Sequence, residues 1–182
     1  MTKLSIKQQK WLKLIHILFA CLWVGGSIAV TLMHFLMNAT DGMQLYGINL
    51  SMKFVDDFII IPGATGSFLT GLLYSIFTKW GWFKHRWITI KWIINLYGVV
   101  FGTICLGPWL NSLPPIAKKE GLNALTNITY INNQKMLCIW GSFQAITIIF
   151  AVYLSILKPW RKTRSNSPKS IKSQPNDYER AA

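Results

Sequence analysis

Four long apolar runs alternate with shorter polar stretches along the chain. They cover residues 14–37, 58–77, 87–110 and 137–157. Each is about as long as the ~20 mostly apolar residues that a helix needs to cross a bilayer. Lys91 is the only Lys, Arg, Asp or Glu within them. The pattern therefore predicts an all-α, polytopic membrane four-helix bundle that occupies residues 1–157.

The connections between these runs differ in character. The tail 158–182 is rich in Ser, Pro, Asn and Lys and poor in large apolar residues, which predicts a basic, disordered segment. Segment 43–57 carries enough apolar residues to pack against the bundle. Segment 111–136 has Leu or Ile at every third position from 122 to 131, which favours a short helix lying on the outer surface. Asp56 and Asp57 precede the second run and fit a helix N-terminus there.

The distribution of basic residues predicts how the chain is oriented in the membrane. The net charge is +13, but only four of the 19 Lys and Arg residues fall on one side of the predicted bundle, namely Lys53, Lys118, Lys119 and Lys135. The positive-inside rule then places both termini in the cytoplasm, N-in and C-in. The other cations are explained as topology signals and as contacts with anionic lipid headgroups at the cytoplasmic face of the bilayer. This distribution argues against a nucleic-acid partner.

Small and polar residues within the runs predict how the helices pack. Gly98 and Gly102 form a GxxxG pair, and Ser67 and Gly71 are spaced in the same way. Such residues let helices approach closely in lipid. Three further side chains are suited to hydrogen bonds between helices, namely Asn95, Gln144 and Thr147. Four spans leave little room for a solute pathway in one copy, so a transporter would require a homo-oligomer.

Ionisable groups inside a span are expensive and become functional candidates. His16 and Lys91 each lie about one turn inside the cytoplasmic end of their runs, and His85 lies just outside. An imidazole can ligate haem iron, and a cation can pair with a haem propionate. The alternative is structural: Lys91 extends to the headgroups and His16 bonds a neighbouring carbonyl. The residues leave both interpretations open.

A second group of candidate ligand residues lies at the predicted outer end of the first run. His34 follows His16 by five helical turns, about 27 Å, so the two cannot share one metal ion. Thioether and imidazole ligands suit copper(I), which makes Met33, His34 and Met37 a candidate copper site, with ordinary packing as the alternative. Cys105 and Cys138 fall near the same surface, and whether they pair stays open.

The stretch LKLIHILFACLWVGG, with FKHRWITIKWIINLYGVVFGTICLGPW further on, resembles a family of bacterial four-span integral membrane proteins of unknown function. The match covers about residues 8–112. A more distant similarity is to the haem-binding membrane protoporphyrinogen oxidase and to the copper-resistance D membrane family. The matching positions are His16, Trp23, Trp87 and Lys91. The resemblance implies a bacterial plasma membrane and a haem b site. The oxidase has a further third-span histidine where this chain has Gly98, which argues against a doubly ligated haem.

Two functions follow from these observations. The first is a haem-associated or redox membrane protein in which His16, Trp23, His85 and Lys91 bind the cofactor. The second is a non-enzymatic membrane module, either a packing partner or a component that handles a small solute or a metal. The sequence contains no recognisable nucleophile constellation or phosphate-binding loop, so no catalytic residue is assigned.

Overall fold

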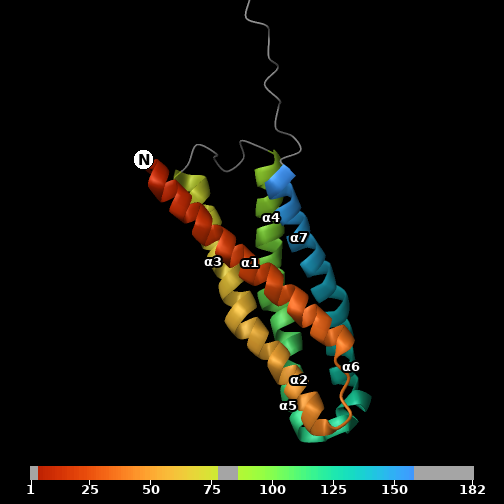
Figure 1. Ribbon diagram of the computed structural model, residues 1–182. Helices are drawn as coiled ribbons and strands as arrows, with labels where there is room; N and C mark the ends of the chain where they lie inside the picture. Colours follow the sequence, from red (N-terminus) through yellow and green to blue (C-terminus); the bar gives the residue numbers. More distant parts are fainter. Residues whose placement is uncertain (1–3, 78–85, 158–182) are drawn as a thin grey trace, which may run out of the picture.

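The computed structural model describes residues 4–77 and 86–157 and shows a bundle of long helices (Figure 1). The predicted disordered tail and His85 lie outside the described residues. Four continuous helical rods, Ile6–Leu36, Gly42–Phe77, Ile88–Thr126 and Ile128–Leu157, are long and apolar enough to cross a membrane. The prediction of an all-α, multi-pass membrane four-helix bundle is therefore confirmed.

Three of the rods are built from several segments. The first is one helix, α1 (Ile6–Leu36). In the second, α2 (Gly42–Val55) passes through a π-helical turn, η1 (Asp56–Ile60), into α3 (Ile61–Phe77). The third rod comprises α4 (Arg86–Phe101), the π-helical η2 (Gly102–Leu106), α5 (Gly107–Glu120) and the 3-10 turn η3 (Gly121–Thr126). The fourth rod comprises α6 (Ile128–Met136), the π-helical η4 (Leu137–Gly141) and α7 (Ser142–Leu157).

The second rod begins much earlier than the sequence suggested. Asp41 caps α2, and its carboxylate accepts a 2.8 Å hydrogen bond from the backbone N–H of Gln44. The prediction of a helix N-terminus at Asp56 and Asp57 is wrong, because the chain is already helical for almost four turns before them. Asp57 instead forms an ion pair of 2.6 Å with Lys53.

The two connections that were predicted to lie outside the membrane prolong the rods. The second rod has 36 residues, so it is about 54 Å long, well beyond the ~30 Å hydrocarbon core. We call α2, α5, η3 and α6 together the outer extension; they lie at the lower end of Figure 1. The prediction that 111–136 forms a helix lying on the outer surface is corrected, since α5 and α6 continue the third and fourth rods.

The outer extension has its own core. Leu113, Ala117, Ala124 and Tyr130 are fully or almost fully buried in it, and the predicted packing of segment 43–57 is confirmed by Leu45 and Met52 in the same cluster. Asn49 Nδ2 donates a 2.9 Å hydrogen bond to the Tyr130 hydroxyl within this core. A buried polar pair of this kind fixes how α2 and α6 lie against each other.

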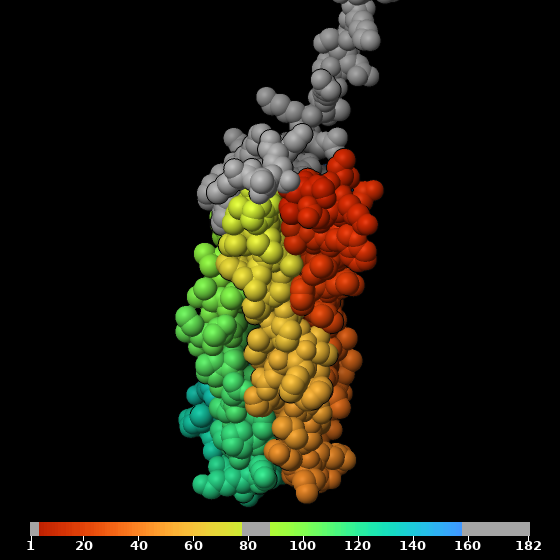
Figure 2. Space-filling view, turned by 90° about the vertical axis from the view of Figure 1, so that its left-hand side faces the viewer, coloured from red at the N-terminus to blue at the C-terminus, as the bar shows by residue number. Residues whose placement is uncertain are grey.

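Glycines set the contact between α1 and α3. A Cβ at Gly63 would lie only 2.6 Å from the backbone nitrogen of Trp23, and one at Gly66 would meet the ring of Phe19. Only glycine permits such an approach, so the prediction of close packing at small residues holds for this pair. Figure 2 shows α3 lying along α1 on one side and along the α4–α5 rod on the other.

The GxxxG pair of the third rod has a different use. A Cβ at Gly98 would lie 2.7 Å from the Trp23 ring, and one at Gly102 would lie 3.5 Å from Gln144 Nε2. These glycines therefore make room for side chains of α1 and α7 rather than for another helix backbone. The start of α1, the end of α3, the start of α4 and the end of α7 lie at one end of the bundle (Figure 1). Which side of the membrane this end faces stays a prediction.

Candidate functional site

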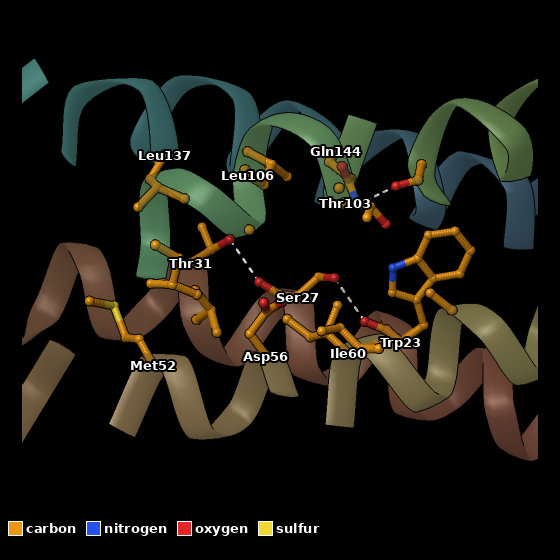
Figure 3. A pocket seen from close by; sticks show the side chains of 18 of the residues that line it. Trp23, Ser27, Thr31, Met52, Asp56, Ile60, Thr103, Leu106, Leu137 and Gln144 are labelled. Carbon is orange, nitrogen blue, oxygen red and sulfur yellow. Dashed lines mark hydrogen bonds between the residues drawn. The ribbon is translucent and has the colours of Figure 1, made fainter. Parts of the chain in front are cut away.

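A cavity of about 360 Å³ lies between the four rods, where the bundle meets the outer extension (Figure 3). We call it the bundle cavity. α1 contributes Trp23, Ser27, Thr31 and His34, and the other rods contribute Asp56, Ile60, Gly98, Thr103, Leu106, Leu137, Ser142 and Gln144 among others. In Figure 3, Trp23, Ser27 and Asp56 lie on one side, and Thr103, Leu106 and Gln144 lie on the other.

The three π-helical turns surround this cavity. η1 supplies Asp56 and Ile60, η2 supplies Thr103 and Leu106, and η4 supplies Leu137. A π-helical turn is wider than an α-helical one and shifts the direction of the side chains that follow. Single π turns are rare and are frequently found at functional sites. Three of them at one level are a structural reason to regard the cavity as the candidate site.

Buried polar atoms without partners belong to residues that line the same space. In the described part of the chain, five buried side-chain atoms have no hydrogen bond, and three of them belong to residues that line the cavity: Trp23 Nε1, Ser142 Oγ and Gln144 Oε1. Trp23 and Gln144 are only 3% and 4% exposed. Leaving such an atom unsatisfied costs about 1–3 kcal/mol. A bound molecule with complementary polar groups would remove that cost.

Three other hydroxyl groups on the cavity wall already have partners. Ser27 Oγ donates to the Trp23 carbonyl and Thr31 Oγ1 to the Ser27 carbonyl, each at 2.8 Å (Figure 3). Thr103 Oγ1 donates to the Val99 carbonyl at 2.8 Å. Gln144 Nε2 reaches the Gly98 carbonyl at 3.4 Å, which confirms the predicted hydrogen bond from Gln144 to another helix. The indole N–H of Trp23, the amide oxygen of Gln144 and the Ser142 hydroxyl are thus among the groups left for a ligand.

The predicted hydrogen bonds of the other two polar residues are not seen. Thr147 bonds the Gln144 carbonyl of its own helix at 2.8 Å, so the prediction of an interhelical bond is wrong for it. Asn95 Oδ1 is buried without a partner. It does not line the bundle cavity.

Asp56 adds a carboxyl group to the cavity wall. Within the described residues its side chain has no hydrogen bond or ion pair, whereas its neighbour Asp57 is held by Lys53. Lys53 is also bound at 2.7 Å to Asn111, so its ammonium is engaged elsewhere. The sequence pattern alone is typical of a helix cap formed by both aspartates. The one signal that could have separated them was the i, i+4 spacing of Lys53 and Asp57.

The predicted haem residues do not all lie together. His16 Nδ1 is 2.9 Å from Thr70 Oγ1, whose hydroxyl donates to the Gly66 carbonyl. A hydroxyl has one proton, so Nδ1 must be the donor to Thr70, and the lone pair of the ring lies on Nε2. Lys91 lies within electrostatic range of His16, as their predicted depths required. Neither residue lines the bundle cavity, whereas Trp23, about two turns further along α1, does.

The candidate copper ligands have three different environments. His34 lines the bundle cavity, Met33 packs against the core of the outer extension, and Met37 is 48% exposed. Between residues 4–77 and 86–157, no three or more His, Cys, Asp or Glu side chains form a group that could hold a metal ion. Cys105 and Cys138 are free thiols here, in η2 and η4. The copper hypothesis stays a prediction.

Fold and site together define a multi-pass α-helical membrane protein with a partly polar cavity between its spans. No protein-family model, curated protein or solved structure matches the chain. The resemblance of residues 8–112 to bacterial four-span membrane proteins therefore remains a prediction. Function is accordingly inferred from the geometry of the cavity and its lining residues.

Proposed function

We propose that this protein of the bacterial plasma membrane is a binding module that holds a small organic molecule in the bundle cavity. The observation that carries the proposal is that three residues lining one cavity, Trp23, Ser142 and Gln144, each have a buried polar atom without a partner. They come from two rods that are far apart in the sequence. Isolated packing defects would not be expected to gather at a single cavity.

The dimensions of the cavity support the same conclusion. Small-molecule sites have volumes of about 300–1,000 Å³ and mostly apolar walls with a few polar groups that orient the ligand. The bundle cavity, at about 360 Å³, lies at the lower end of that range. Its apolar wall includes Ile60, Leu106 and Leu137. A molecule with one apolar body and one or two polar groups matches this arrangement.

Native mass spectrometry of protein extracted from its own membranes in mild detergent tests the proposal. We expect a fraction of the wild-type protein to carry an additional small-molecule mass. Ser142→Leu places a larger side chain in the cavity and removes one polar group, so the additional mass should be lost. Ser155→Leu is the matched control, because Ser155 lies on the same helix but does not line the cavity. Equal ligand content in the two variants would contradict the proposal.

A second candidate function is haem binding at the opposite end of α1. It is favoured by His16, whose Nδ1–H is held by Thr70 so that Nε2 is the nitrogen able to ligate iron. Lys91 nearby is suited to a propionate. A haem bound there would supply electron-transfer chemistry. The two candidate sites are separate, so each can be tested without the other.

A further inference from the structure

We infer that the ligand of the bundle cavity is a lipophilic organic amine, held as an ammonium ion by the Asp56 carboxylate. The inference rests on the proposed function and adds the chemical class of the ligand. Asp56 is the starting point because it lines the cavity without a hydrogen bond or ion pair of its own within the described residues. A carboxyl group beside a membrane span is expensive unless a cation compensates it.

No basic side chain in the described part of the chain forms an ion pair with Asp56. Lys53, the nearest basic residue along the helix, is held by Asp57 at 2.6 Å and by Asn111 at 2.7 Å. His34 also lines the cavity, but an imidazole with an ordinary pKa near 6.5 is mostly neutral at pH 8. At that pH the cavity therefore presents one carboxylate and no fixed positive charge from its lining residues.

The unpartnered atoms indicate where the hydrogen atoms of an ammonium group would go. An ammonium has three donors and no acceptor. Asp56, Gln144 and Ser142 line the cavity and carry acceptor oxygens, and those of Gln144 and Ser142 have no partner. Trp23 Nε1 is a donor and would face an oxygen elsewhere on the ligand, or a bridging water. The ring of Trp23 and the side chain of Phe35 add aromatic surface that favours a cation.

The size of the cavity favours an organic over an inorganic cation. At about 30 Å³ of liquid volume per water, 360 Å³ is far more space than one dehydrated metal ion fills. A bound metal ion also needs several hard ligands, and no group of three such side chains exists in the part of the chain that the structure describes. An apolar body attached to the ammonium would fill the remaining volume against Ile60 and Leu106.

A pair of probes of nearly equal shape tests the inference. Phenethylamine is charged at pH 8, because aliphatic amines have a pKa close to that of lysine, about 10.4. 2-Phenylethanol is its neutral counterpart. Binding of each to the full-length protein in mild detergent would be measured by calorimetry, with wild type, Asp56→Asn and Asp41→Asn. Asp41→Asn is the matched control, since Asp41 caps the same rod, does not line the cavity, and asparagine can accept the same capping hydrogen bond.

We expect wild type to bind the amine about tenfold more tightly than the alcohol, as one charge-assisted contact predicts. Asp56→Asn should lose that preference, and Asp41→Asn should keep it. Equal binding of both probes to wild type, no binding of either, or an unchanged preference in Asp56→Asn would overturn the inference. Stabilisation by sodium chloride but not by choline chloride, lost in Asp56→Asn, would overturn it in favour of an inorganic cation. If both probes bind equally and Ser142→Leu abolishes both, the inference fails while the proposed function stands.

Discussion

The indole ring of Trp23 on α1 lies directly against Gly98 of α4. A Cβ on Gly98 would stand 2.7 Å from Trp23 Cζ2 and 2.8 Å from Cη2. The ring is 3% exposed and forms one end of the bundle cavity, with its N–H left without a partner. The missing side chain at Gly98 is therefore what allows Trp23 to occupy its position between the rods.

Gly98→Ala should destabilise the protein. The added methyl group would collide with a buried ring that has little room to move, and overpacking of this kind costs about 1–3 kcal/mol. The measurement is thermal unfolding in mild detergent. Gly25→Ala is the control, because a Cβ at Gly25 meets nothing within 4 Å. It should be neutral or slightly stabilising, since alanine favours helix over glycine. Equal melting temperatures for the two variants would disprove the close contact.

Tyr130→Phe should loosen the outer extension. The substitution removes the hydroxyl that accepts the Asn49 hydrogen bond and leaves a buried amide group unpaired. The expected loss is about 1–3 kcal/mol in the free energy of unfolding. Tyr153→Phe, at a residue that is 53% exposed, should stay within about 0.5 kcal/mol of wild type. The idea that this pair holds α2 against α6 would be abandoned if Tyr130→Phe were equally harmless.

The haem hypothesis predicts a characteristic absorption band of the purified protein. Protein purified from haem-replete cells should show a Soret band that His16→Ala weakens, because His16 would be the iron ligand. Lys91→Leu should also lower the haem content, and Lys91→Arg should be milder. His34→Ala is the control, since His34 lies about 27 Å from His16 along α1 and should leave the band unchanged. A colourless preparation that also fails to bind added haemin would rule the hypothesis out.

The charge distribution predicts the orientation. A reporter that is active only in the periplasm should be active when inserted after Asn123, an exposed position in η3. The same reporter fused after Lys162 should be silent. The opposite pattern would reverse the assignment of both membrane faces, while the fold itself would remain as described.

The spans could be predicted because uninterrupted apolar runs of bilayer length are rare outside membrane helices. The outer extension could not be predicted as a continuation of the rods, because its sequence contains the usual signs of loops. Pro114 and Pro115 lie inside α5, and Asp56 and Asp57 lie in the middle of the second rod. Tertiary packing between α2 and α5 overrides these local preferences.

The candidate site was only partly visible in the sequence. Trp23 was a candidate only because it matches a position of the haem-binding oxidase. Gln144 was expected to form a hydrogen bond with another helix, and it does. The sequence pattern did not predict that these two residues line one cavity. The π-helical turns that shape the cavity have no recognisable periodicity in the sequence. The glycines at 98 and 102 were a usable signal, but they were interpreted as a helix-packing motif rather than as space for side chains.

The most direct test of ligand binding in the bundle cavity is an experimental structure of the protein extracted from its own membranes, at a resolution that shows bound small molecules. We predict density for a non-protein organic molecule in the cavity, within hydrogen-bonding distance of Trp23 Nε1 and of Gln144 Oε1. A cavity that contains only ordered water, or that has closed so that these atoms bond each other or the backbone, would contradict the proposed function.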